Sequence, residues 1–599
     1  MEWPAADNAP ALAKAVKAFF DSPGQEPSAQ SLERLLPRLQ AVRRGDQPEL
    51  WDKLIESLAD ACRDPTWREP IERAGLLKYC LESLDAAELP VDSSKQLLRA
   101  IGNGVADRDE SRAVVLPFLD KIMSCLQNPA LLPVAISVLY NTCLGYDPAQ
   151  KEAAGLRLDR QLCRHLSDDP PNVSQLIELL AWVSDKLSDD VLGESEDCLN
   201  ATIQYLSSCE EWEDFKHLIA AASVYLQDSS VQAKVLHSDG MSQITTLLKQ
   251  KTDQLDQLQA SMRDDEKKGF LEDLRIATGL VMNAIAAITA SDDFTRLYTL
   301  SSPLIREQGA WLSSPSPILR TCACITLGNI AVSDAVNIDM VHEHSHHLPT
   351  LRILATSTDR TELYLAAGFL RHLAQPAANV EPVTAAQPLP TLAALLDRKE
   401  PELDFEAAAV LRRLVNNSRA TAVALAQDTP TLDKLLTAAK QTKTGFEVGR
   451  LLIAICRRLS ERQSDEQAAA AAAAAADSTD RCWTSLLAHD ELLRPLVLMV
   501  RQEQVPALAS EAWFGLGLVV ASSPAGARKV VDAFEDEDNW NALRAAVTTG
   551  DAGGADRKNV VTTVNVVAQS LEEGAEKQRW VELAKECWQD ASSAPAITQ

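Results

Sequence analysis

The feature that most constrains this chain is a short sequence pattern that recurs along most of its length. In each copy, apolar residues spaced as on a buried helix surround a core of Gly or Arg followed by Asn or His. A polar turn rich in Asp, Asn and Ser follows. Clear copies span Leu97–Val115, Ile136–Ala154, Thr278–Leu297, Ala323–Val341, Ala366–Val383 and Ala408–Leu425. Such a repeat predicts a stack of similar helical units rather than one globular core.

The period of the repeat indicates the kind of stack. With Asn103, Asn141, Asn283, Asn329, His372 and Arg413 taken as equivalent, the adjacent copies are 38, 46, 43 and 41 residues apart. These are armadillo or HEAT periods. A shorter helical stretch precedes each copy, as in Leu348–Asp359, which favours the three-helix armadillo repeat over the two-helix HEAT repeat. We therefore expect an all-α, armadillo-type right-handed helical solenoid of roughly 11–12 repeats.

The pattern also suggests where the solenoid begins and where it is interrupted. Residues 1–29 are expected to form a partly disordered N-terminal segment, and residues 30–595 one continuous armadillo-like solenoid. Residues 249–268 form a strongly charged insertion. Residues 463–480 form a low-complexity segment that contains nine consecutive alanines, Ala468–Ala476, which favour a helix but give no packing specificity.

Composition and charge limit the classes of partner. The 599 residues are 46% hydrophobic but only 5% aromatic, and the formal net charge is −27, which disfavours nucleic acid and anionic membranes. The acidity either suits a basic partner surface or serves only to prevent aggregation. No run approaches the roughly 18 apolar residues of a membrane helix, and no signal peptide is evident. Because the twelve cysteines are scattered, a reducing compartment is expected: the cytosol, with the nucleus also open.

A solenoid of this kind offers a groove lined by the third helix of each repeat. An Asn there can present one acceptor and two donors to the main chain of a bound segment, or it can bond the neighbouring repeat and support stacking. Acidic residues in the following turns can steer a basic partner, or they can simply favour turns. The candidate groove residues are Asn103, Asn141, Asn283, Asn329, Arg371, His372 and Arg413, and the candidate acidic rim comprises Asp107, Asp109, Glu110, Asp147, Asp292, Asp293 and Asp334.

No motif for covalent chemistry can be read in the chain. The phosphate-binding, dinucleotide-binding, serine-hydrolase and zinc-protease patterns are absent from the sequence, so we expect neither an enzyme nor a cofactor. The richest candidate for a metal site is the run HEHSHH, which contains His342, His344, His346 and His347. It lies in an expected loop, and no cluster of Cys or carboxylates at ligand spacing accompanies it. No metal is therefore expected.

Three copies resemble a known family. The stretches TCACITLGNIAVSDAVNIDMV, AAGFLRHLAQPAANVEPV and AAAVLRRLVNNSRATAVAL look like the central and C-terminal repeats of SmgGDS, the armadillo-repeat stimulators of GDP dissociation from small GTPases. The matching motifs are Leu327–Ala331, Leu370–Pro376 and Leu411–Leu414, with His372 where the family usually has Asn. The stretch LLRAIGNGVADRDESR is similar to an early repeat of the family.

The resemblance implies a monomeric guanine nucleotide exchange factor or chaperone for Rho- and Rap-type small GTPases with basic, often prenylated tails. Exchange of this kind needs no nucleophile, because preferential binding of the nucleotide-free state releases GDP. Asn283, Asn329, Arg371 and His372 would then be the central contacts. The alternative is a non-catalytic armadillo scaffold or transport adaptor for basic peptides or proteins, although the Trp that accompanies Asn in importin grooves is not evident.

Overall fold

The computed structural model describes residues 2–5, 8–21, 29–45, 47–85, 88–168, 170–461, 479–502, 505–548, 555–572 and 574–591. Within these residues the regular structure is α-helix with short 3₁₀ turns, and no strand occurs. The chain forms two compact units, residues 1–297 and 298–599, which are called unit 1 and unit 2. The alanine run lies outside the described residues.

The helices of unit 1 are α1 (Ala9–Phe20), α2 (Ala29–Glu33), α3 (Leu36–Arg44), α4 (Pro48–Ala61), α5 (Pro65–Arg73), α6 (Leu76–Ser83), α7 (Val91–Gly104), α8 (Asp109–Val115), α9 (Leu119–Ser124), α10 (Leu132–Cys143), α11 (Asp147–Gly155), α12 (Leu158–His165), α13 (Val173–Ser184), α14 (Asp189–Leu192), α15 (Glu196–Ser208), α16 (Trp212–Tyr225), α17 (Ser229–His237), α18 (Gly240–Ser261), α19 (Asp264–Thr289) and α20 (Asp292–Leu297).

The helices of unit 2 are α21 (Pro303–Trp311), α22 (Pro317–Ile330), α23 (Asp334–His342), α24 (His347–Thr356), α25 (Arg360–Leu373), α26 (Val380–Ala385), α27 (Pro388–Leu396), α28 (Pro401–Asn417), α29 (Arg419–Gln427), α30 (Thr429–Ala438), α31 (Thr442–Ser460), α33 (Arg494–Val500), α34 (Pro506–Ser522), α35 (Pro524–Ala533), α36 (Glu537–Thr548), α37 (Ala555–Ser570) and α38 (Ala575–Ala591).

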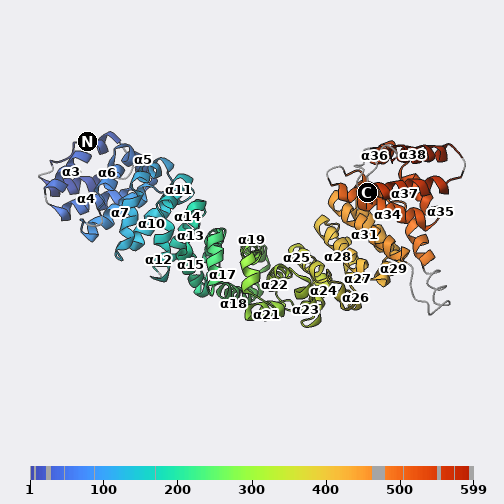
Figure 1. The fold of residues 1–599 in the computed structure, drawn as a ribbon. Coiled ribbons are helices and arrows are strands. Elements are labelled where there is room, and N and C mark those ends of the chain that lie inside the picture. Colours follow the sequence, from blue (N-terminus) through green and yellow to red (C-terminus); the bar gives the residue numbers. More distant parts are fainter. Residues whose placement is uncertain are drawn as a thin grey trace, which may run out of the picture. The chain divides into compact units, whose positions relative to one another are not determined.

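Every third helix packs against the next one of its kind (Figure 1). The series is α1, α4, α7, α10, α13, α16 and α19 in unit 1, and α22, α25, α28, α31, α34 and α37 in unit 2. We call these the third helices, because shorter helices lie between successive members and complete each repeat. This three-helix unit is the armadillo repeat. The prediction of an all-α, armadillo-type solenoid is therefore confirmed.

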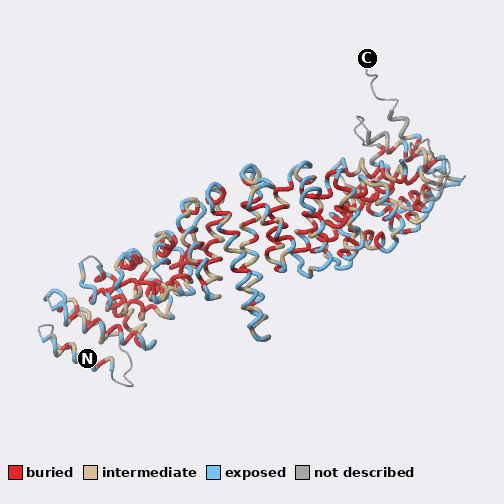
Figure 2. The backbone as a smooth tube through the Cα atoms, turned by 90° about the horizontal axis from the view of Figure 1, so that it is seen from below, coloured by how far each residue is buried: buried red, intermediate tan, exposed pale blue. Residues whose placement is uncertain are grey.

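The third helices form the core because they are apolar on several faces. In α28 the run Glu406–Leu411 is buried throughout, and Ala407, Ala408 and Ala409 allow α25 and α31 to approach from either side. In α22 the run Thr321–Leu327 is buried in the same way. A helix that is apolar nearly all round belongs in the interior. Figure 2 shows the buried backbone running along the inside of each unit, with exposed segments at the turns.

The polar turns of the repeat have a structural function as helix caps. The carboxylate of Asp359 accepts a hydrogen bond of 2.7 Å from the backbone N–H of Glu362 at the start of α25. Ser333 caps α23 and Ser418 caps α29 in the same manner. A capping side chain satisfies one of the backbone donors that a helix leaves free at its start. This explains the serines that follow the apolar runs of α22 and α28.

The charged stretch 249–268 lies in the second half of α18 and the beginning of α19, the longest pair of helices in unit 1. Helix α19 packs on α16, while much of this pair is exposed and extends from the row of third helices (Figure 2). Within residues 1–29, α1 packs on α4 as the first third helix. None of the described helices is both long enough and apolar enough to cross a bilayer.

The close contact between α31 and α34 gives a test of the packing. A Cβ atom on Gly515 would lie 2.6 Å from Cγ1 of Ile453, whereas a Cβ on Gly368 in α25 would meet nothing within 4 Å. We predict that Gly515→Ala lowers the free energy of unfolding by about 1–3 kcal/mol through overpacking. Gly368→Ala, the matched control, should raise it by up to about 1 kcal/mol because Ala favours the helix. Thermal and urea denaturation would measure both changes. A Gly515→Ala variant with the same free energy of unfolding as the wild type would contradict the close contact between α31 and α34.

Candidate partner-binding surface

Three candidate groove residues occupy the same position on successive third helices of unit 2. Asn329, His372 and Arg413 each lie twelve residues after the first residue of α22, α25 and α28. All three side chains are half-buried. Because these helices pack side by side, the three side chains form a row across three repeats. The spacing of the repeat therefore places them in register.

Ion pairs join the third helices next to this row. Arg371 on α25 lies 2.8 Å from the carboxylate of Glu406 on α28, and Arg412 on α28 lies 2.6 Å from Glu447 on α31. Both glutamates are buried, and each is the sixth residue of its helix. The pairs are therefore repeats of one interaction. Breaking a buried pair of this kind is costly because it leaves a charge unpaired.

Two further pairs extend the series along unit 2. The guanidinium of Arg320 on α22 contacts the fully buried Glu362 of α25 at 2.5 and 3.1 Å. Arg450 on α31 contacts Glu511 on α34 at 2.7 and 3.3 Å. The series thus connects α22, α25, α28, α31 and α34, and we call it the ion-pair ladder. The ladder was not predicted from the sequence, although Glu406 and Glu447 recur one period apart, as do Arg371 and Arg412.

Arg413 differs from its neighbours because it takes no part in the ladder. Its Nε is buried without a hydrogen-bond partner, and the guanidinium forms no ion pair with any residue that the structure describes. Burial, and then the charges of Arg412 and Arg371, lower the pKa of Arg413 to about 10, against the opposing effect of Glu447 and Glu406. It remains protonated at neutral pH. Arg413 can therefore donate hydrogen bonds to a partner.

The imidazole of His372 lies beside these cations. Burial first, and then Arg371 and Arg413, lower the pKa of His372 below its ordinary value, so the ring is neutral at pH 7. A neutral imidazole offers one donor and one acceptor. Together with the amide of Asn329, the row offers donors and acceptors that suit the main chain or carboxylates of a bound protein. It has no arrangement of nucleophile and base.

In unit 1, two candidate asparagines bond the preceding repeat. Nδ2 of Asn103 on α7 donates to the carbonyl of Ala59 on α4 at 2.8 Å, and Nδ2 of Asn141 on α10 donates to the carbonyl of Gly102 on α7 at 3.1 Å. These are the stacking bonds that the sequence left open as the alternative role. Asn283 is exposed on α19. Binding of a partner by these residues stays a prediction.

Most residues of the candidate acidic rim begin the short helices that follow the third helices. Asp109 and Glu110 lie in the first turn of α8, Asp147 in that of α11, Asp292 and Asp293 in that of α20, and Asp334 in that of α23. Negative charge at a helix N-terminus is favourable, which explains their position. Asp107 precedes α8 with a backbone φ of 56°.

Basic side chains of the same unit neutralise much of this rim. Asp107 contacts Arg68 at 3.3 Å, Asp109 contacts Arg112 at 2.8 Å, and Glu110 contacts Arg108 at 3.7 Å. Asp147 bonds Lys151 at 2.6 Å and Lys186 at 3.1 Å, and hydrogen bonds with these lysines lower the pKa of Asp147. Asp293 pairs with Arg296. Asp292 and Asp334 are exposed and form no ion pair within the described ranges.

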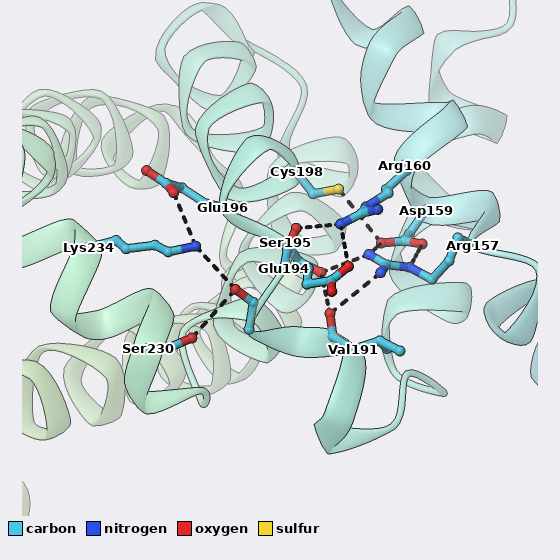
Figure 3. A network of polar contacts seen from close by, with 11 residues as sticks. Arg157, Asp159, Arg160, Val191, Glu194, Ser195, Glu196, Cys198, Ser230 and Lys234 are labelled. Carbon is cyan, nitrogen blue, oxygen red and sulfur yellow. Dashed lines mark hydrogen bonds and ion pairs between the residues drawn. The ribbon is translucent and has the colours of Figure 1, made fainter.

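A polar network in unit 1 uses its basic residues to connect α12, α15 and α17 (Figure 3). Arg157 contacts Asp159 at 2.9 Å and Ser195 at 2.8 Å, and Lys234 contacts Glu196 at 3.3 Å. No sequence pattern indicated this network, because its members come from three repeats. Nearby, the carboxylates of Asp189, Asp190 and Asp197 are exposed and form no ion pair with described residues. They are available to a basic partner.

The histidine run does not converge on one point. His342 Nε2 lies 3.2 Å from the carbonyl of Ala378, while His346 is buried against Gly309. Burial, and then His344 and His347, lower the pKa of His346 to about 4. Across the described ranges, no group of three or more His, Cys, Asp or Glu side chains could hold a metal ion.

The three-helix repeat and the rows of polar side chains on its third helices define an armadillo repeat protein. No family model matches the sequence. The chain is 22% identical over 436 residues to the GTPase-GDP dissociation stimulator vimar of Drosophila melanogaster, covering 68% of this chain and 65% of vimar. It therefore spans about two thirds of the length of the curated relative it matches. The chain is thus an armadillo repeat protein that is similar to a GTPase-GDP dissociation stimulator.

Two solved structures share the fold. The crystal structure of SYS-1 superposes with a TM-score of 0.51 at 11% identity, covering 95% of this chain and 97% of that one. A structure from work on a phosphorylation switch that controls the interaction between cadherin and beta-catenin gives a TM-score of 0.50 at 13% identity, covering 94% and 97%. At these identities the likeness concerns the fold.

A buried carboxylate on α28 predicts a dependence of stability on pH. Burial, and then the charge of Glu400, raise the pKa of Asp404 to about 6, and its Oδ1 has no hydrogen-bond partner. Since the folded-state pKa lies above that of the unfolded chain, this group favours folding most at low pH, and its contribution is lost as pH rises from about 4 to 6. Asp404→Asn should therefore stabilise unit 2 at pH 7.5 by about 1–2 kcal/mol and have little effect at pH 4.

Thermal denaturation at both pH values would measure this change. Glu402→Gln, which removes an exposed carboxylate of the same turn whose pKa is lowered, is the control and should not stabilise the protein at pH 7.5. Equal melting temperatures for Asp404→Asn and the wild type at pH 7.5 would contradict the raised pKa.

Proposed function

We propose that this protein binds small GTPases of the Rho and Rap type and stimulates their release of GDP. The similarity to vimar, whose name is GTPase-GDP dissociation stimulator, carries the proposal. The protein would act in the cytosol or the nucleus as a monomer. Its activity would come from binding energy rather than from covalent chemistry.

The mechanism is preferential binding of one state of the GTPase. A GTPase alternates between a closed form that holds GDP and an open form that does not, and a protein that binds the open form more tightly shifts the equilibrium toward it. Each 1.4 kcal/mol of preference shifts this equilibrium about tenfold. A row of donors and acceptors across several repeats is suited to this task because it can contact an extended protein surface. No nucleophile or metal is required.

In this proposal the row of Asn329, His372 and Arg413 forms the contact on unit 2. Arg371, also a candidate contact, is held by Glu406 and so presents a fixed guanidinium beside the row. A fixed side chain loses less conformational entropy on binding than a free one. The remaining donors of Arg413 would bond carbonyl or carboxylate oxygens of the GTPase.

The charge of the protein supports a basic tail as the second contact. The net charge is −27, and the exposed carboxylates of Asp189, Asp190 and Asp197 form no ion pair within the part of the chain that the structure describes. Attraction between such a surface and a Lys- and Arg-rich tail would raise the association rate and decrease with salt. A chaperone role for prenylated tails belongs to the same proposal.

The double substitution Asn329→Ala and His372→Ala tests the row. We predict that it weakens GTPase binding by about 10- to 100-fold, because donors and acceptors are lost near the centre of the contact. Isothermal titration calorimetry would measure the affinity, and circular dichroism would verify the fold. The control is His344→Ala with Gln375→Ala, two exposed residues outside the third helices. Unchanged affinity in the first variant would contradict the assignment.

Release of fluorescent GDP tests the activity itself. We predict faster release from Rho- and Rap-type GTPases than from a Ras-type GTPase without a basic tail, with a smaller effect at physiological than at low salt. The measurement uses each GTPase with and without its tail. Binding without acceleration would contradict exchange and leave a chaperone or scaffold. No binding would contradict the proposed partner.

A further inference from the structure

A groove of about 370 Å³ lies in unit 1 between α18 and the segment that connects α15 with α16. We call it the Lys251 groove. Its walls include Trp212, Phe215, Lys251, Gln254, Leu255 and Leu258. All the candidate groove and rim residues lie elsewhere, so the groove is a separate feature of the surface.

The ammonium group at one end of the groove is not ion-paired with any residue in the described ranges. Lys251 is only 5% exposed, yet among the residues that the structure describes it forms no ion pair. Its Nζ donates to the carbonyl of Cys209 at 2.5 Å and to Oε1 of Gln254 at 3.0 Å, which leaves one N–H. The ring of Phe215 lies 5.9 Å away. The exposed Glu210, which also lines the groove, attracts this ammonium without forming an ion pair with it. A buried ammonium without a carboxylate in contact is costly, and a bound carboxylate would offset that cost.

A second donor in the groove is also unused. Nε1 of Trp212 is buried and has no hydrogen-bond partner. The indole is held in place by Phe215, with ring centroids 5.6 Å apart, and by Phe270 of α19, 4.9 Å away. An indole N–H can only donate, as can an ammonium. The ammonium of Lys251 and the indole N–H of Trp212 can each donate a hydrogen bond to a ligand, and a carboxylate has two oxygens that can accept them.

The opposite part of the groove is apolar with an open polar edge. Leu255 and Leu258 lie about one turn apart on α18, and the exposed side chains of Gln254 and Gln257 border them. From Lys251 to Ser261 the helix rises about 15 Å, the length of four to five residues of extended chain. Amide side chains along the edge suit the main-chain groups of such a segment.

We propose that the Lys251 groove binds an extended acidic segment of a partner protein, with an Asp or Glu carboxylate on Lys251 and Trp212 and apolar side chains against Leu255 and Leu258. The buried ammonium of Lys251, the unsatisfied indole N–H of Trp212 and the length of the groove favour this occupant, and Glu210 on the groove wall opposes it. The proposal does not depend on the proposed GTPase function, because the groove shares no residue with the row on unit 2.

The test uses the full chain and fluorescein-labelled peptides. Two pairs, each labelled with fluorescein on the N-terminal amine, cover both directions of the segment: Glu-Leu-Ser-Leu-amide with its Gln counterpart, and Leu-Ser-Leu-Glu-amide with its Gln counterpart. Fluorescence polarisation should give, for one pair, at least tenfold tighter binding of the Glu peptide. Lys251→Met should remove that difference, whereas Lys249→Met, an exposed lysine of the same helix, should retain it.

A second variant and a stability measurement guard against misfolding. Trp212→Phe keeps an aromatic ring but removes the N–H, and it should weaken the Glu peptide severalfold while leaving the Gln peptide unchanged. Lys251→Met should not lower the melting temperature, because an isosteric apolar side chain replaces a buried charge. Equal affinity for Glu and Gln peptides, or no binding of either pair at 1 mM, would overturn the proposal. Tighter binding of phenylacetate than of the Glu peptide would overturn the choice of a protein segment.

Discussion

The structure depends on the packing of each third helix between two others of its kind. In α28 this contact is made by a buried run that includes three consecutive alanines, and on α34 Gly515 fits against Ile453 where a larger residue would not. Small residues bring neighbouring helices close, and branched residues fill what remains. The shorter helices and their capped turns are arranged around that column. Polar residues of the third helices must therefore either pair across repeats or lie at its surface.

The arginines of the ion-pair ladder pair across repeats, whereas Arg413 does not. Arg371 and Arg412 are paired with glutamates one repeat further along. These pairs fix the relative position of the helices and neutralise the two glutamates. Arg413, next in sequence to Arg412, lies near the same cations and glutamates but forms no ion pair with any described residue. The same division occurs in unit 1, where Arg157 and Lys234 hold the network of Figure 3. The exposed Asp189, Asp190 and Asp197 form no ion pair with a residue that the structure describes. The charged residues that pair across repeats stabilise the stacking, and those left without an ion pair determine the charge of the surface.

The sequence predicted what depends on local periodicity. The spacing of Asn329, His372 and Arg413 placed them in register, and the polar turns marked the helix starts, because both features are repeated and short-range. Contacts between repeats could not be predicted in this way. From the sequence, Asn103 and Asn141 could equally line the groove or support stacking. Only the structure shows that their Nδ2 atoms donate to carbonyls of the preceding repeat. Lys251 stood in a charged stretch that suggested solvent exposure, and its burial depends on how α18 meets Cys209.

The nearest-neighbour character of the ladder has a mechanical consequence. Each pair connects one third helix to the next, so a strain applied at α22 is transmitted to α34 through four successive links, each able to yield a little. Unit 2 is therefore an elastic element, whose compliance is spread over its repeats rather than concentrated at a hinge. A partner that contacts α22, α25 and α28 together would stiffen that portion and leave the remainder compliant.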